Sequence, residues 1–351
     1  MNLGIFLPNW IGDVAMATPT LRALRRHFGP QAHLVGIMRP YVRDVLAGTP
    51  WLDEVVLYDP RGNGPALRGW PFLRTLRACR LDTVVLLTNS LRTAVWARLS
   101  GAQRRVGYSR AGRGPLLTHP LLPPHDGRRF IPTPAVDYYL NLAYLLGCLR
   151  ESPRLELATV PADEQAADAV WDRLQLPRDE PVVALNSGGA FGAAKSWPAE
   201  YFARLASRIA NEQGLHVLVL CGPSERTIAA EIEASAEHPR VVSLANQTLS
   251  IGLTKACIRR SGLLVTTDSG PRHFAAAFDV PVITLFGPTH QAWSETYFPR
   301  AIHLQAPVDC GPCQQRVCPF GHHRCMRELS VERVYRAVEQ QLAKEPQRRA
   351  A

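Results

Sequence analysis

The sequence predicts an α/β protein made of two similar βαβ halves. Short apolar strand patterns alternate with helical patterns along the chain, which is typical of parallel sheets covered by helices. The 351 residues are enough for two domains with separate cores. A loosely patterned stretch at residues 152–180, with three prolines, separates the two series of strands. We therefore expect domains at 1–176 and 177–329, then a C-terminal helix and tail at 330–351. A cleft between two such halves would hold a small ligand.

Each half contains five expected strands. In the first half they are Leu3–Leu7, His33–Ile37, Glu54–Leu57, Thr83–Leu87 and Arg105–Gly107. In the second half they are Val182–Asn186, His216–Leu220, Val241–Leu244, Leu263–Thr267 and Val280–Phe286. Apolar spacing predicts helices at Ala162–Leu174 and Ser330–Ala343, the latter capped by Ser330. Residues 110–134 are rich in Gly, Pro and Arg, which indicates a surface loop.

Composition and charge narrow the class of protein. Hydrophobic residues make up 46% and charged residues 20%, and no apolar run approaches the ~20 residues that cross a bilayer. The N-terminus lacks the pattern of a signal peptide, so we expect a cytoplasmic protein. The net charge of +10 indicates an anionic partner, although a GC-rich genome also enriches arginine. Aromatic residues do not alternate with the basic ones, so a nucleic acid is not the expected partner.

The most informative segment is residues 265–277, where an apolar strand meets an Ala-rich helix. Asp268 ends the strand and Ser269-Gly270 forms the turn. The first turn of a helix presents unpaired N–H groups and a partial positive charge, which suits a phosphate. Gly270 allows close approach of an anion, and Pro271 fits the first helical position. The alternative is a plain turn in which Asp268 or Ser269 caps the helix.

The turns after three other strands carry further polar groups. The loop at residues 186–198 contains Ser187, Gly188 and Lys195, whose ammonium could neutralise a diphosphate, although a single loop lysine is usually only solvated. Glu225 follows another strand and could accept hydrogen bonds from ribose hydroxyls, and Thr289 follows a further one. The loop at residues 186–198 has neither the Walker pattern nor the glycine pattern of dinucleotide-binding folds. Together the four turns favour a nucleotide-sugar pocket.

Asp13 lies in the first half, where the first strand leads through Gly12 into a helix. A carboxylate there could act as a general base toward an acceptor hydroxyl. Helix capping by Asp13 is an equally good interpretation.

Four of the eight cysteines fall in one Pro- and Gly-rich segment beside His322 and His323. They are Cys310, Cys313, Cys318 and Cys325, a C-x2-C-x4-C-x6-C spacing. This spacing suits a structural Zn²⁺ site, with disulfides or free thiols as alternatives. A catalytic metal is not expected, because the phosphate-binding features lie in other turns.

The ordered motifs resemble the lipopolysaccharide heptosyltransferases of glycosyltransferase family 9, most closely their heptosyltransferase II branch. The resemblance covers nearly the whole chain. It rests on these segments: Pro8–Asp13 with Thr18-Pro19, Asn89-Ser90, Arg105–Tyr108, Gly192–Pro198, Thr267–Gly270 with His273, and Phe286–Thr289. Each motif is weak alone, but their order and spacing are specific.

This resemblance implies a GT-B architecture, with two Rossmann-like domains facing a central cleft. The first domain would bind the acceptor, the second an ADP-sugar donor, and the C-terminal helix would return to the first. The implied reaction is an inverting, metal-independent transfer of heptose from ADP-L-glycero-D-manno-heptose to the heptose of the lipid-A-linked inner core. A different ADP-sugar or acceptor is the alternative, and a zinc-bearing nucleic-acid binder a remote one.

The resemblance also assigns roles to single residues. Asp13 matches the general base and Lys195 the lysine on the donor phosphates. The other donor-binding residues it implies are Glu225 for the ribose, Asp268 for the sugar, Ser269 and Gly270 for the diphosphate, His273 beside them, and Thr248 near the adenine. Where the family often has Asn and Leu-Met, this chain has Thr267 and Pro271-Arg272, which adds a cation near the diphosphate.

The basic residues of the first half suggest peripheral contact with an anionic membrane, which would hold the acceptor lipid. The arginines considered for this contact are Arg104, Arg105, Arg110, Arg113, Arg128 and Arg129.

Overall fold

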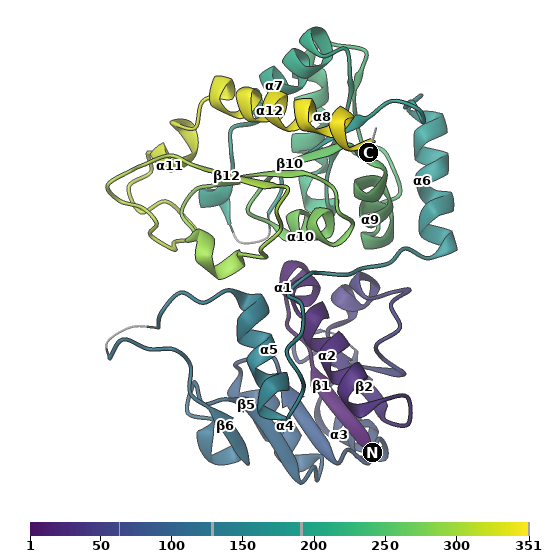
Figure 1. Cartoon of the computed structure of the whole chain (residues 1–351), viewed down its shortest axis with the longest axis vertical. Coiled ribbons are helices and arrows are strands. Elements are labelled where there is room, and N and C mark those ends of the chain that lie inside the picture. The colour runs from purple at the N-terminus through teal and green to yellow at the C-terminus, as the bar shows by residue number, and fades with distance from the viewer. Residues whose placement is uncertain (63, 128–129, 190–191, 350–351) are drawn as a thin grey trace. The chain divides into compact units, whose positions relative to one another are not determined.

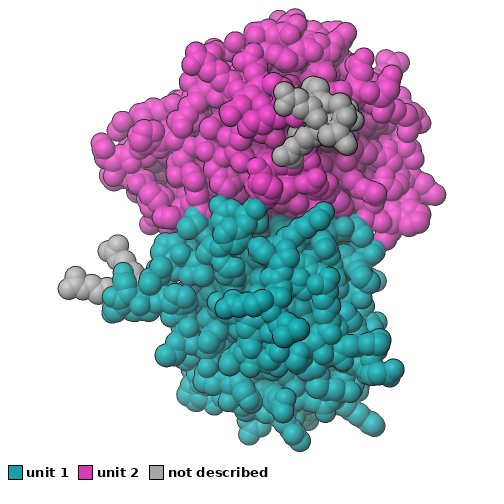
Figure 2. Space-filling view, viewed as in Figure 1, with its two compact units in different colours: residues 1–158, 292–297 teal, residues 159–291, 298–351 magenta. Residues whose placement is uncertain are grey.

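The computed structural model describes residues 1–62, 64–127, 130–189 and 192–349, with side chains up to 344 (Figure 1). It divides into two compact units, which Figure 2 distinguishes by colour. The first unit comprises Met1–Ala158 and Ala292–Tyr297, and the second comprises Thr159–Gln291 and Phe298–Ala351. The expected boundary at 176 is therefore wrong. Helix α6 (Pro161–Arg173) belongs to the second unit, because Arg260 of that unit forms ion pairs with Glu164 and Asp168 on α6.

The first unit contains a parallel six-stranded sheet in the order β3-β2-β1-β4-β5-β6. Its strands are β1 (Asn2–Phe6), β2 (His33–Met38), β3 (Glu54–Leu57), β4 (Thr83–Leu86), β5 (Arg104–Tyr108) and β6 (His119–Leu121). Its α-helices are α1 (Ile11–Met16), α2 (Thr18–Phe28), α3 (Gly69–Ala78), α4 (Leu91–Leu99) and α5 (Ala135–Leu145). In the register of this sheet, Ile5 of β1 pairs with Gly36 of β2 and Val85 of β4.

The second unit repeats the plan with the order β12-β11-β10-β7-β8-β9. Its strands are β7 (Val182–Asn186), β8 (His216–Leu220), β9 (Val241–Ser243), β10 (Leu263–Thr267), β11 (Val282–Phe286) and β12 (Ala301–Gln305). Beyond α6, its α-helices are α7 (Ala199–Glu212), α8 (Arg226–Ala236), α9 (Ile251–Arg260), α10 (Gly270–Ala277), α11 (Arg324–Arg327) and α12 (Val331–Arg349). When each unit's strands are counted from its own first strand, both sheets have the Rossmann order 3-2-1-4-5-6.

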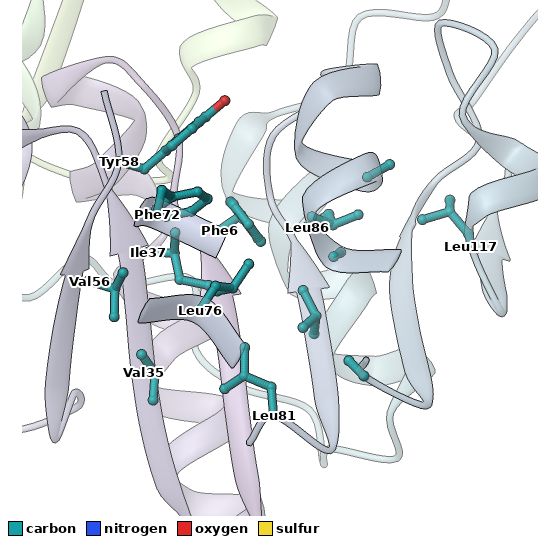
Figure 3. Packing of buried hydrophobic residues seen from close by; sticks show 14 residues of the cluster. Phe6, Val35, Ile37, Val56, Tyr58, Phe72, Leu76, Leu81, Leu86 and Leu117 are labelled. Carbon is teal, nitrogen blue, oxygen red and sulfur yellow. The ribbon is translucent and has the colours of Figure 1, made fainter. Parts of the chain in front are cut away.

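The interior strands are buried, which explains why they were predicted from continuous apolar runs in the sequence. The strands β4, β7, β10 and β11 are buried along their whole length, as expected for parallel strands with helices on both faces. In the first unit, Phe6, Tyr58, Phe72 and Leu86 belong to one apolar cluster under α3 and α4 (Figure 3). The ten expected strands are all present, with ends shifted by up to two residues.

Two edge strands, β6 and β12, were not predicted from the sequence. The strand β6 is short and partly exposed and lies within the segment expected to be a loop, and β12 is mostly half-buried. Neither has the continuous apolar run of an interior strand, so neither carries a strong sequence signal.

The C-terminal helix belongs to the second unit, and its expected return to the first domain stays a prediction. The helix α12 packs on α7 of its own unit, where Arg208 is paired with Glu332 and Gln213 donates to Tyr335 Oη at 2.8 Å. The amide of Arg333 bonds to Ser330 Oγ at 3.3 Å, which confirms Ser330 as the cap.

Candidate active site

The predicted donor residues mostly follow β7, β8 and β10, at the carboxyl edge of the second sheet. The loop after β7 carries Ser187, Gly188 and Lys195, while Asp268 and Ser269 follow β10. Since β7 and β10 are adjacent and the strand order reverses there, this is the switch point at which open α/β sheets bind ligands. The topology therefore brings residues some eighty positions apart to one place.

A buried ion pair joins the two loops. Lys195 Nζ lies 2.6 Å from Asp268 Oδ2 and 2.9 Å from the Asp268 carbonyl oxygen. The side chains are only 11% and 9% exposed. The interpretation of Lys195 as a solvated surface lysine is therefore wrong, because its charge is held in place inside the protein.

Asp268 also bonds to two further groups. Thr289 Oγ1 donates to Asp268 Oδ2 at 2.7 Å, and the guanidinium of Arg272 lies 3.5 Å from Oδ1. Burial alone would raise the pKa of Asp268, but the charges of Lys195 and Arg272 hold it far below its usual value. Two cations therefore face the Asp268 carboxylate.

Arg272 is almost completely buried. It lies over the ring of Phe286 and bonds to His303 Nε2 at 2.9 Å. The sequence suggested an added cation beside the diphosphate. The structure instead places the guanidinium against Asp268, within the protein.

The start of α10 keeps its amides facing this edge. Ser269 occupies the N-cap position, but no side chain caps the helix. Its hydroxyl instead accepts from Asn186 Nδ2 at 3.0 Å and lies 3.1 Å from Thr266 Oγ1. The capping alternative for Ser269 is therefore wrong, and the turn at Gly270 stands at a helix mouth that suits an anion. Asn186 was not assigned a role from the sequence, although its place at the end of a buried strand was a usable signal.

Gly188 and Glu225 lie beside each other. A side chain on Gly188 would meet the Glu225 carboxyl carbon at 2.5 Å, so Glu225 would have to move to make room for it. Glu225 Oε2 accepts from the amide of Gly222 at 2.6 Å, which fixes the carboxylate at the end of β8. Next to them, the Ser187 hydroxyl is buried and has no hydrogen-bond partner among the described residues. A buried hydroxyl without a partner is costly unless a ligand or water completes it.

Two further predicted donor residues differ in their burial. His273 is fully buried in α10, where burial, with Arg272, pushes its pKa well below the usual value and keeps it neutral. Thr248 is exposed in the loop between β9 and α9. Its role near an adenine stays a prediction.

The first unit places Asp13 at the equivalent switch point, after β1. Asp13 is partly exposed in the first turn of α1, where Trp10 occupies the N-cap position. Tyr139 is buried nearby: burial and then the Asp13 carboxylate raise its pKa.

A buried network follows β4 on the same edge. Asn89 Oδ1 accepts from Tyr138 Oη at 3.0 Å and from Arg113 at 3.3 Å, and the ring of Tyr138 stacks on Tyr108. Arg113 also donates to the carbonyls of Thr88 and Tyr108 and has no exposed surface. Burial lowers the pKa of Arg113 to about 10.

These contacts correct part of the predicted membrane surface. Arg113 cannot face a membrane, and Arg105 is held by the carbonyls of Leu116 and Ala102. Arg110 is half-buried, with its guanidinium over Phe130. Of that set, Arg104 is exposed, while Arg128 and Arg129 lie outside the described residues.

The four clustered cysteines, together with His322, line one cavity of the second unit. They are Cys310, Cys313, Cys318 and Cys325. Burial and then the three neighbouring sulfurs raise the pKa of Cys325. All four are unpaired thiols, so the disulfide alternative is not observed. No group of three or more His, Cys, Asp or Glu side chains in the described part of the chain is arranged so that it could hold a metal ion.

The cysteine-rich segment also supports the loop that carries Lys195. The amide of Ala194 donates to Arg316 O at 3.1 Å, and the amide of Gln314 donates to Pro288 O at 2.8 Å. Gly192 has a φ of 147° and lies against Arg316 O, which leaves no room for a side chain. The cysteine-rich segment thus holds two turns in place by backbone hydrogen bonds, the turn that carries Lys195 and the turn at Pro288.

Comparison with known proteins decides the family. Residues 70–324 match the model of glycosyltransferase family 9 (heptosyltransferase). The chain belongs to glycosyltransferase family 9. It is 31% identical to lipooligosaccharide heptosyltransferase 2 of Campylobacter jejuni, over 96% of this chain and 98% of that protein.

Two solved structures share the fold of this family 9 enzyme. A family 9 glycosyl transferase from Veillonella parvula superposes with a TM-score of 0.82 at 24% identity, covering 98% of this chain and 97% of that one. The E. coli ADP-heptose lps heptosyltransferase II superposes with a TM-score of 0.78 at 22% identity, covering 99% and 100%.

The predicted fold class is confirmed. The chain is an α/β glycosyltransferase with two Rossmann-like units of the GT-B type. None of its described helices has the length and apolar character needed to span a membrane.

Proposed function

We propose that this family 9 enzyme transfers heptose from ADP-L-glycero-D-manno-heptose to the heptose of the lipid-A-linked inner core, with inversion and without a catalytic metal. The observation that carries the proposal is the buried Lys195–Asp268 pair beside the mouth of α10. The names of its relatives support the donor and acceptor classes, since they include a lipooligosaccharide heptosyltransferase and an ADP-heptose enzyme.

The donor would bind at the carboxyl edge of the second sheet. Lys195 would place its ammonium toward the diphosphate, and the amides at Ser269 and Gly270 add a partial positive charge. This charge suits a diphosphate, and it would stabilise the leaving ADP in place of a metal. Asp268 holds Lys195 in position, and its direct contact with the sugar is part of the proposal.

The remaining donor contacts come from the neighbouring turns. Ser187 offers a buried hydroxyl that lacks a partner among the described residues, and Gly188 leaves room beside it. Glu225 would accept from the ribose hydroxyls, while Thr248 would lie near the adenine and His273 would support the diphosphate turn.

Asp13 would supply the base. It would remove the proton from the acceptor hydroxyl as that oxygen attacks the anomeric carbon and ADP leaves from the opposite face. General-base catalysis of this kind contributes about 10²–10⁴ in rate. In this scheme the first unit binds the acceptor and the second unit binds the donor.

We also propose that the cysteine-lined cavity holds a structural Zn²⁺. Four thiols and an imidazole line this single cavity, and thiolates are the preferred ligands of structural zinc. Binding would require the side chains to turn toward a common centre, because they are not so arranged in the described structure. Elemental analysis tests this: a stoichiometric metal that Cys313→Ser and Cys318→Ser remove supports the site, and metal-free active protein rejects it.

The acceptor suggests the place of action. A lipid-A-linked acceptor is anchored in a membrane, so we propose a cytoplasmic enzyme that works peripherally at the inner face of the inner membrane.

A product assay tests the proposed reaction. The enzyme is incubated with ADP-L-glycero-D-manno-heptose and defined truncated core acceptors, and products are identified by mass. Addition of one heptose to a heptose-bearing core supports the proposal. Transfer only with another ADP-sugar or acceptor favours the alternative family 9 activity. Salt-sensitive binding to nucleic acid without any transfer would favour the remote alternative.

A further inference from the structure

A long part of the first unit carries arginines with almost no acidic residues. Between Asp59 and Asp126, the only acidic residue is Asp82. The same stretch contains eleven arginines: Arg61, Arg68, Arg74, Arg77, Arg80, Arg92, Arg98, Arg104, Arg105, Arg110 and Arg113. The first eight of these are exposed.

The adjacent helices α3 and α4 carry four of these exposed arginines, and Arg68 directly precedes α3. Their inner faces meet at Phe72 and Trp96, whose ring centroids lie 5.4 Å apart. Arg77 Nε donates to Leu99 O at 2.9 Å, which joins the ends of the two helices. The inner faces cover the core of the first unit, and the outer faces are exposed (Figure 3).

Large apolar side chains stand among the arginines on that outer surface. Trp70 on α3 is 68% exposed. On α4, Leu91, Val95 and Leu99 are all exposed and follow an i, i+4, i+8 spacing, which places them in one stripe. Within the described residues, no ion pair neutralises Arg68, Arg74, Arg77, Arg92 or Arg98. We call this α3–α4 surface, with its arginines and apolar stripe, the arginine face.

We propose that the arginine face docks on an anionic phospholipid surface. Unneutralised arginines attract anionic headgroups, and Trp and Leu side chains enter the headgroup boundary. A nucleic acid would use the arginines but gain little from an aliphatic stripe, whereas a bilayer uses both.

The position of the face fits a membrane-borne acceptor, and in this respect the inference rests on the proposed function. The helices α3 and α4 start after β3 and β4 end, so Trp70 and Leu91 lie toward the carboxyl edge of the first sheet. Asp13 follows β1 at the same edge. Docking would thus bring the lipid surface to the end of the unit that carries the proposed base.

Vesicle binding tests the proposal. Full-length enzyme is floated with phosphatidylcholine vesicles that contain or lack phosphatidylglycerol. The triple variant Arg68→Gln, Arg74→Gln, Arg98→Gln should bind the anionic vesicles roughly a hundredfold more weakly, since each arginine near such a surface contributes about a factor of five. A second variant, Trp70→Ser with Leu91→Ser, should also bind more weakly, with the remaining binding more easily removed by salt.

The matched control removes the same charge from the second unit. Arg204, Arg327 and Arg333 are all exposed there, and their replacement by Gln should leave vesicle binding near the wild-type value. Equal losses in both triple variants would overturn the proposal, as would binding that ignores phosphatidylglycerol or an affinity for duplex DNA without vesicle binding. Turnover on a delipidated, water-soluble acceptor distinguishes failure of the docking proposal from failure of the proposed function. The triple variant should turn this acceptor over at the wild-type rate. If the proposed function is wrong, neither the wild type nor any variant will do so.

Discussion

The two units share one strand order but place different chemistry at the switch point. In the second unit, the turns after β7 and β10 meet in a buried cluster of charges around Asp268. In the first unit, the corresponding turns after β1 and β4 carry a partly exposed Asp13 and a hydrogen-bonded network around Asn89. The scaffold therefore sets where a ligand binds, and the turn residues set what is bound.

The contrast fits the proposed division of roles between the units. A diphosphate needs fixed positive charge, and the second unit has Lys195 and the start of α10 at its carboxyl edge. A sugar acceptor needs one base and polar groups around it, and the first unit has Asp13 and a network in which Arg113 is bonded to carbonyl and amide oxygens.

Replacing Asp13 should have the largest effect. Asp13→Asn keeps the size of the side chain but removes the base, so we expect kcat to fall by about 10²–10⁴ while ADP affinity is retained. Steady-state kinetics and calorimetry with ADP measure the two quantities. Asp44→Asn, an exposed carboxylate of the same unit, should be near normal. Near-normal turnover in Asp13→Asn would remove this residue from the mechanism.

Replacing Lys195 tests the donor-binding role that we propose for the second unit. Lys195→Met should weaken ADP binding roughly 10- to 100-fold, because a charge-assisted contact to phosphate contributes about 1.5–3 kcal/mol. It should also lower the melting temperature, since the buried Asp268 then loses its shortest ion pair. Arg204→Gln in the same unit serves as the control for net charge. If calorimetry gave equal ADP affinities for the wild type and Lys195→Met, Lys195 would have no phosphate role.

The sequence predicted the interior strands and the site residues next to them, because these depend on local patterns of apolar residues. Interior strands are continuous apolar runs, so β7 and β10 were found, and the residues just after them were found as candidates. The edge strands β6 and β12 lack such runs and were missed.

Long-range contacts were not visible in the pattern. Nothing in the local sequence shows that Arg113 turns inward to three oxygens or that Arg272 is bound to Asp268. The packing of α12 on α7 depends on side chains more than a hundred residues apart, such as Gln213 and Tyr335. An amphipathic helix has an apolar face, but its sequence does not say which surface covers it.

The buried His273 gives the second unit a pH dependence that the first unit's network does not share. Its pKa is lowered by burial in the folded protein, whereas the unfolded chain titrates near 6.5. Below about pH 6.5 the unfolded state takes up a proton that the folded state does not. Stability should therefore fall with decreasing pH by up to about 1.4 kcal/mol per pH unit, until the folded-state pKa is reached.

Thermal unfolding between pH 7.5 and 5 (roughly the window around the unfolded pKa) measures this slope. We expect His273→Gln to flatten it, and the exposed His119→Gln to leave it as in the wild type. His216, whose pKa is also lowered by burial, is present in both variants and cancels in the comparison. Equal slopes for His273→Gln and the wild type would show that the buried imidazole does not control acid stability.

We expect the smallest effect from removing one tyrosine hydroxyl in each unit. Tyr138→Phe removes the bond to Asn89 in the first unit, and Tyr335→Phe removes the bond from Gln213 in the second. Each should cost about 1 kcal/mol, seen as a melting temperature lower by roughly 2–4 °C. Only Tyr138→Phe should also change the KM for the acceptor, because Tyr138 lies at the carboxyl edge of the first sheet and supports Asn89, while Tyr335 secures α12. An acceptor KM that changes equally in both variants would contradict the assignment of acceptor binding to the first unit.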